Sequence, residues 1–244
     1  MKSDLANYIS GGYYITKYVE RPSYSSADLL PEKILSLSKC ICEFVPDTWT
    51  LSWTGDSDED RQKNAAFFGL TPETFEQVSA WTVSHFDNEI GWPNVCFDLE
   101  TARLIRHQFI PPTEQVVIFG IALHKSLQNK FCNYAKPPEQ QEGFAPVGET
   151  GLYRAIKTTS ALPENGKVLG FEPVSYDQLQ EHSWLCNGLE KEIHQKLGVR
   201  PNGNGYIDDF ETALKCVNHI SLDEVGAEPG LWLPWLIIKY DEPT

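Results

Sequence analysis

Four residues in the last third of the chain have the types and spacings of a metal site. His182 and Cys186 are four residues apart, and Cys216 and His219 are three apart. Residues at these spacings share one face of a helix. We predict two amphipathic helices here, over 178–197 and 208–220, joined by a Gly/Asn turn. Two facing helices of this kind would present four ligands to a tetrahedral zinc ion.

Helical angles argue against that site. His182 and Cys186 fall inside the Leu-rich stripe of the first helix, and Cys216 lies at the edge of the second stripe. His219 lies beyond that edge, roughly opposite Phe210. The closely paired cysteines of structural zinc sites are also missing. We therefore interpret His182, Cys186 and Cys216 as core packing and His219 as facing away, and expect no metal ion and no cofactor.

Two other catalytic arrangements are weaker still. His182 and Cys186 would form a thiol–imidazole dyad, but a nucleophilic thiolate must be accessible, and a Leu-rich stripe buries it. Asp208 and Asp209 would form a carboxylate pair. They open a helix, where acids satisfy free N–H groups and the helix dipole, so capping is the better interpretation.

The densest acidic run is 56–60. Its spacing resembles the start of a calcium loop, but Arg61 and Phe67 stand where that loop needs Gly and Glu. A solvated run that opens a helix is the better interpretation. The same run concentrates negative potential, which suits a basic partner. Its acids are Asp56, Asp58, Glu59 and Asp60.

Hydrophobic periodicity predicts an α+β fold: a mixed sheet of about six or seven strands with helices packed on it. We expect strands at 13–19, 49–53, 94–98, 115–123, 152–158, 167–174 and 232–240. We expect further helices at 30–44, 56–68, 71–89, 99–108 and 124–134. A strand over 35–44 is the alternative to the first of these helices. All 244 residues form one domain, with a possible loop boundary at 136–149.

Charge and cysteine content limit the partners and the compartment. With 34 acidic and 20 basic residues, the net charge of −14 disfavours nucleic acids and anionic membranes. The N-terminus lacks the apolar segment of a secretory signal, and no run of about 18 apolar residues occurs. The six cysteines lie in apolar segments, so we expect reduced thiols in a cytoplasmic protein.

Two functional hypotheses remain, because the common catalytic motifs are absent. The first is a non-catalytic binding protein for a basic protein, most concretely an immunity protein that masks the active site of a bacterial toxin. Its partner-binding residues would be Asp56, Asp58, Glu59, Asp60, Trp81 and Trp184, since both tryptophans fall off their helices' core stripes. The second is a hydrolase that uses Asp208, Asp209 and His182.

Overall fold

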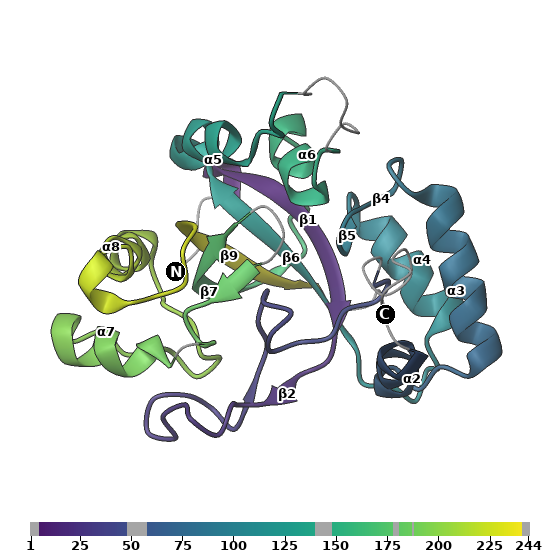
Figure 1. Ribbon diagram of the computed structural model, residues 1–244, viewed down its shortest axis with the longest axis horizontal. Coiled ribbons are helices and arrows are strands. Elements are labelled where there is room, and N and C mark those ends of the chain that lie inside the picture. The colour runs from purple at the N-terminus through teal and green to yellow at the C-terminus, as the bar shows by residue number, and fades with distance from the viewer. Residues whose placement is uncertain (1–4, 48–57, 140–147, 178–180, 187, 241–244) are drawn as a thin grey trace.

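The computed structural model describes residues 5–47, 58–139, 148–177, 181–186 and 188–240 (Figure 1). Its main element is a seven-stranded sheet in which every pairing is antiparallel. In spatial order the strands are β4 (Ile90–Gly91), β5 (Val95–Cys96), β1 (Tyr8–Thr16), β6 (Val117–His124), β9 (Leu231–Tyr240), β7 (Lys167–Tyr176) and β8 (Glu181–Ser183). The predicted α+β class and strand number are confirmed, but the sheet is antiparallel and not mixed as predicted.

Helices and a small second sheet surround this main sheet. The α-helices are α2 (Asp58–Phe67), α3 (Pro72–His85), α4 (Leu99–Phe109), α5 (Gln128–Ala135), α6 (Gly151–Thr158), α7 (Leu189–Leu197) and α8 (Phe210–Ile220). The 3-10 turns are η1 (Leu5–Asn7), η2 (Lys125–Leu127) and η3 (Asp223–Val225). The second sheet pairs β2 (Val19–Glu20) with β3 (Lys33–Ile34).

Both faces of the main sheet are buried. In β6, Ile118 and Ala122 join one apolar cluster, while Phe119 and Ile121 join a second cluster on the opposite face. The first cluster is completed by α3, α4, α7 and α8, and the second by α5, α6 and the segment 35–44. The prediction that 115–123 is apolar on both faces, as a central strand should be, is therefore confirmed.

Local capping signals place several helices where the sequence predicts them. Thr71 caps α3 by accepting a hydrogen bond from the Thr74 amide, and Pro72 occupies the first turn. Asp209 caps α8 by accepting from the Thr212 amide at 2.9 Å. The predicted strand at 49–53 and the acid Asp56 lie outside the described residues.

The predicted helix over 30–44 is wrong. Its apolar positions, including Ile34 and Leu37, are buried as expected, but the backbone forms only β3 followed by turns. The Leu37 amide donates to the carboxylate of Glu172 on β7, 3.0 Å away, so a contact distant in sequence replaces the helical bond. The alternative strand over 35–44 is wrong as well, because none of these residues pairs as a strand; the nearest pairing is the bridge between Val45 and Ile15.

The segment 152–158 is helix α6, where a strand was predicted. Thr150 accepts a hydrogen bond from the Tyr153 amide and so caps this helix. Its buried residues follow a helical period: Leu152, Tyr153, Ala155 and Ile156. A Cβ on Gly151 would lie 2.8 Å from the Gly91 backbone, so glycine permits close packing of α6 on β4.

The continuous helix over 178–197 is also wrong. Strand β8 pairs with the end of β7, with His182 opposite Ser175, and α7 begins only at Leu189. Gly188 takes the left-handed conformation between them, with φ of 63°. His182 therefore lies on a strand and Cys186 in the turn after it, so the helical angles assigned to both residues do not apply.

Candidate functional site

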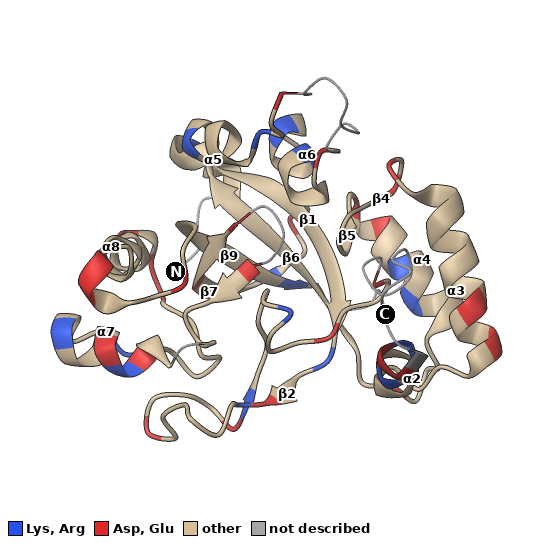
Figure 2. Ribbon diagram, in the orientation of Figure 1, with Lys and Arg blue, Asp and Glu red and all other residues tan. Residues whose placement is uncertain are grey.

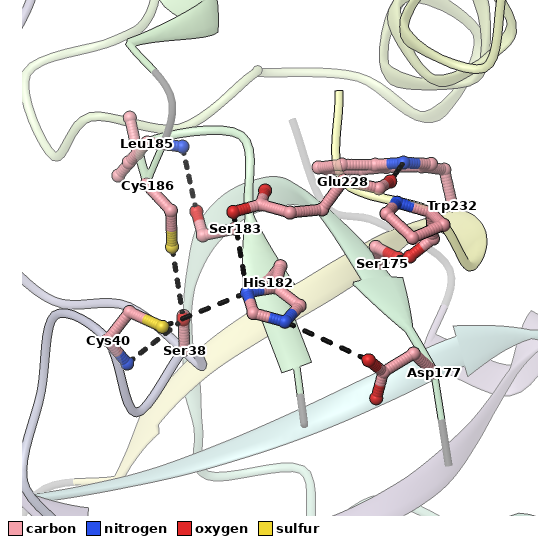
Figure 3. A network of polar contacts seen from close by, with 11 residues as sticks. Ser38, Cys40, Ser175, Asp177, His182, Ser183, Leu185, Cys186, Glu228 and Trp232 are labelled. Carbon is pink, nitrogen blue, oxygen red and sulfur yellow. Dashed lines mark hydrogen bonds and ion pairs between the residues drawn. The ribbon is translucent and has the colours of Figure 1, made fainter. Parts of the chain in front are cut away.

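Two thiols and an imidazole converge at one end of the sheet (Figure 3). The sulfur atoms of Cys40 and Cys186 and a ring nitrogen of His182 all lie within 4.8 Å of one another. Cys40 Sγ is 3.7 Å from His182 Nδ1. Cys40 is exposed and the other two residues are half-buried, so the cluster is accessible from solvent. We call these three residues the thiol–imidazole cluster.

A turn built on Ser38 positions Cys40. The Cys40 amide donates to Ser38 Oγ at 3.2 Å, and the amides of Ile41 and Cys42 donate to the Ser38 carbonyl. The same Ser38 hydroxyl lies 3.1 Å from Cys186 Sγ. One buried hydroxyl thus contacts both thiol-bearing segments, although they are far apart in sequence.

Glu172 ties the loop that carries Cys40 to the strand that carries His182. This fully buried carboxylate accepts hydrogen bonds from Ser36 Oγ at 2.5 Å and from Ser183 Oγ at 2.7 Å. Ser183 follows His182 on β8, and its hydroxyl also accepts a hydrogen bond from the Leu185 amide at 3.1 Å. The position of the cluster therefore depends on an acid that is not a member of it.

The ring of His182 lies between two carboxylates. Asp177 Oδ2 is 3.9 Å from Nε2, and Glu228 Oε1 is 3.8 Å from Nδ1, on the side of the ring that faces Cys40 (Figure 3). The indole N–H of Trp232 holds the Glu228 segment by donating to the Glu228 carbonyl at 3.0 Å. A Cβ on Gly230 would lie 2.2 Å from Ser175 Oγ, so glycine lets this segment approach β7.

The two thiols have opposite electrostatic character. Hydrogen bonding from Cys186 is the largest cause that lowers the pKa of Cys40 to about 5, against burial, and Ser38 and His182 lower it further. The same bond, together with burial, raises the pKa of Cys186. Cys40 is thus the thiolate of the pair at neutral pH.

This arrangement permits three kinds of chemistry. A thiolate beside an imidazole is a nucleophile when its surroundings are electropositive. Two neighbouring thiols can form a disulfide, although all six cysteines are free in this structure. Two thiols and one imidazole nitrogen also form the ligand set of a zinc ion. The two carboxylates on His182 make the surroundings negative, which favours a cation over a nucleophile.

The structure separates the four residues of the sequence-derived metal set. His182 and Cys186 come together, but with Cys40 instead of Cys216 and His219. Cys216 is fully buried in the core, as the packing interpretation predicted. His219 Nε2 lies 3.1 Å from Glu192 Oε1 on α7 and links the two helices.

The acid pair of the hydrolase hypothesis has structural partners. Asp209 caps α8, as predicted, and its bond to the Thr212 amide is the largest cause that lowers its pKa. Asp208 accepts a hydrogen bond from Asn202 Nδ2 at 2.8 Å. Neither carboxylate belongs to the group of residues around His182.

The two tryptophans of the predicted partner-binding set differ from each other. Trp184 is fully buried, so the prediction that it faces outward is wrong; the residue follows a strand, and the helical angle used for it does not exist. Trp81 is half-buried, stacks on the His85 ring at 4.0 Å, and contacts Phe109. Trp81 thus keeps part of its surface available.

Three acids of the same set, Asp58, Glu59 and Asp60, lie on α2, and Asp56 is outside the described residues. Asp58 is the first residue of that helix. The side chains of Glu59 and Asp60 are 74% and 57% exposed, and Lys63 pairs with both at 3.0 and 3.9 Å. Exposed pairs of this kind contribute little energy, so both acids remain available to a partner.

Comparison with protein-family profiles, curated proteins and solved structures finds no match to this chain. Within the described part of the chain, the helices are too short or too polar to cross a bilayer.

Sequence reasoning missed Cys40, Asp177 and Glu228. The sequence contains one signal for Cys40. Polar residues, among them Ser36 and Ser38, interrupt the apolar segment around it at alternate positions. Buried hydroxyls in such a segment indicate a local hydrogen-bonding network. Asp177 and Glu228 have no comparable signal, because only tertiary structure brings them to His182.

Proposed function

We propose that this protein is a non-catalytic binding protein whose partner is a basic protein. In its most concrete form it is an immunity protein that neutralises a bacterial toxin by covering the toxin's active site. The observation that carries the proposal is the excess of 34 acidic over 20 basic residues. Such a surface attracts a basic protein over long distances and raises the rate of association.

Helices α2 and α3 supply the surface that fits this role best. Figure 2 shows acidic residues on both helices. Arg61 joins them, because it pairs with Glu76 at 3.0 Å and lies over the Phe75 ring. We define the α2–α3 surface by its exposed residues: Glu59, Asp60, Glu73, Glu76, Ala80 and Val83.

The α2–α3 surface combines charge with apolar area. Four of its residues lie along one side of α3, because their spacing is i, i+3, i+7 and i+10. They are Glu73, Glu76, Ala80 and Val83. Acids occupy one end of this stripe, and Val83, which is 69% exposed, occupies the other. Acidic groups would attract the partner, while Val83 would provide apolar contact; Trp81, on the side of α3 that contacts Phe109, would add apolar area at the edge of this surface.

The hydrolase alternative has less support. A cavity of about 510 Å³ lies between α6 and the segment after α3, and His182 does not line it. Polar groups that line this cavity are already paired: Arg154 with Asp87 at 2.7 Å, Thr150 with the Tyr176 hydroxyl at 2.6 Å, and Glu149 with Lys157 at 2.7 Å. Groups already paired in this way are poorly placed for acid–base catalysis.

Affinity capture followed by co-expression tests the proposal. The chain should capture a basic protein from the cells that produce it, and co-expression should relieve the growth defect that this partner causes. Neutralising Glu59→Gln together with Asp60→Asn should weaken binding by about fivefold to tenfold, since each exposed charge contributes up to about 1 kcal/mol.

The matched control is Glu20→Gln with Glu164→Gln, which removes the same charge from exposed sites outside the α2–α3 surface. Binding by this control should stay within about twofold of the wild type, because long-range attraction alone changes little. Equal losses in both double variants would place the interface elsewhere. Capture of no basic protein, or a growth defect that persists, would refute the proposal.

A further inference from the structure

The strongest unassigned feature is the thiol–imidazole cluster of Cys40, His182 and Cys186. In the described part of the chain, these are the His, Cys, Asp and Glu residues whose ligand atoms converge closely enough to hold one metal ion. We propose that the cluster binds a zinc ion through the two sulfur atoms and His182 Nδ1. Helical angles for His182 and Cys186 predicted no metal here, but His182 lies on β8 and Cys186 in the turn after it.

The distances fit tetrahedral zinc. With Zn–S of about 2.3 Å and Zn–N of about 2.0–2.1 Å, tetrahedral angles separate sulfur from nitrogen by about 3.6 Å and the two sulfurs by about 3.8 Å. Cys40 Sγ lies 3.7 Å from His182 Nδ1. The other separations are at most 4.8 Å, about 1 Å longer than ideal at most, and rotation of one thiol closes that difference.

The second nitrogen of His182 supports a metal-binding role. Asp177 Oδ2 lies 3.9 Å from Nε2, on the side of the ring away from the thiols. Histidines that ligate metals commonly direct their other ring N–H to a carboxylate, which fixes the ring and increases its basicity. A zinc ion on Nδ1 would leave Nε2 protonated and directed at Asp177, across a gap that a small ring rotation closes.

The fourth position faces Glu228. Its Oε1 lies 3.8 Å from Nδ1, on the side of the proposed ion, and the Trp232 indole anchors its backbone. Glu228 is outside the set of ligand atoms that lie within 4.8 Å of one another, so its carboxylate would have to move towards the thiols to become the fourth ligand, and a water molecule is the alternative. The Ser38 hydroxyl, 3.1 Å from Cys186 Sγ, is placed to donate to a zinc-bound thiolate.

Zinc suits this ligand set better than the hard cations do. Thiolate and imidazole select zinc and other borderline or soft metals, whereas magnesium and calcium require oxygen ligands. Two thiolates and a carboxylate also place negative charge around the site, and a divalent cation offsets it. Cys40 and Cys186 come from separate segments, so the ion would cross-link the loop at 38–42 to the turn after β8.

The test uses the purified full-length chain, reduced and stripped of metal. After addition of zinc chloride and gel filtration, elemental analysis should find about one zinc per chain. Cobalt chloride should give the intense visible bands of tetrahedral cobalt together with thiolate-to-cobalt charge transfer. Cys40→Ser and Cys186→Ser should each lower zinc affinity by at least about 100-fold, measured by competition with a chromophoric chelator.

Cys132→Ser is the matched control, because Cys132 is a partly exposed free thiol on α5, outside the cluster. This variant should keep full zinc affinity. Asp177→Asn should lower affinity by about tenfold to 100-fold through loss of its contact with His182. Circular dichroism establishes that each variant is folded.

Three results would overturn the zinc site. One is a folded, reduced wild-type chain that retains no zinc and gives no tetrahedral cobalt spectrum. Another is zinc binding by Cys40→Ser and Cys186→Ser that is as tight as zinc binding by Cys132→Ser. The third is a Cys40–Cys186 disulfide found by mass spectrometry in protein purified without oxidant. The experiment needs no protein partner, so its outcome is independent of the proposed binding function.

Discussion

Glu172 shows how one buried side chain determines local structure far from it in sequence. It lies in the middle of β7, where a charged residue is unfavourable unless it is fully hydrogen-bonded. Its carboxylate accepts from the Ser36 and Ser183 hydroxyls and from the Leu37 amide. Burial nevertheless outweighs these bonds and raises the pKa of Glu172.

Glu172 should make stability depend on pH. Since its folded-state pKa lies above the ordinary value of 4.5, the folded chain holds a proton that the unfolded chain releases. The free energy of unfolding should therefore fall as pH rises from about 4.5 to the folded-state pKa, by up to about 1.4 kcal/mol per pH unit. Urea unfolding of the wild type and Glu172→Gln across this range measures the effect.

The free energies of unfolding of the wild type and Glu172→Gln should approach each other as pH falls to about 4.5. They should separate as pH rises, because Gln does not titrate. Ser36, Ser183 and the Tyr206 hydroxyl also face this carboxyl and stay neutral over the range. Glu164→Gln, at an exposed site, should follow the wild type. Parallel curves for the wild type and Glu172→Gln would contradict the raised pKa.

Single residues also show where periodicity fails. Trp184 was assigned to an outer helix face, yet its amide donates to the Pro173 carbonyl at 3.0 Å and its side chain is fully buried. An angle computed for a helix has no meaning for a residue that follows a strand. Cys40, in contrast, is exposed although it was expected to pack as a small hydrophobe.

At the scale of elements, some helices with local start signals were predictable, but α6 was not, although Thr150 caps it. Asp98 and Asp209 each accept a hydrogen bond from the amide three residues later, and the sequence places α4 and α8 within a few residues. The segment 30–44 has an equally regular apolar stripe, but contacts with Glu172 and Ile15 determine its backbone. Tertiary contacts of this kind are invisible to periodicity.

Helix α8 provides a direct test of the capping interpretation. Asp209→Ala removes the 2.9 Å bond to the Thr212 amide and should lower the free energy of unfolding by about 1 kcal/mol. Asp208→Ala is the matched control; this exposed residue precedes the cap, and its loss should cost no more than about 0.5 kcal/mol. Urea unfolding at pH 7 compares them, and equal losses would contradict the assignment.

At the scale of the whole molecule, the central strands of the sheet were predictable and the candidate site was not. Central strands such as β6 and β9 are continuous apolar runs, so their burial on both faces follows from composition. Cys40 and His182 are 142 residues apart, and they meet because the loop at 35–44 packs on the same sheet that carries β8. No spacing rule connects residues brought together by a fold of this kind.

The net charge of −14 should make the whole fold sensitive to salt. Unbalanced charges repel one another more in the compact state than in the unfolded chain. Raising the ionic strength from 0.01 M to 0.15 M shortens the screening length from about 30 Å to about 8 Å. Screening also weakens exposed ion pairs such as Arg154–Asp87, but each pair contributes little.

Repulsion should therefore dominate, and the midpoint of urea unfolding at pH 7 should rise as sodium chloride is added. Urea is the suitable denaturant because it is uncharged and leaves the ionic strength unchanged. Glu139→Lys with Glu164→Lys, both at exposed sites, changes the net charge from −14 to −10, since each substitution adds two positive charges. This variant should be more stable than the wild type at 0.01 M salt and nearly equal to it at 0.15 M. A wild-type midpoint that falls with salt would mean that attractive pairs outweigh the overall repulsion.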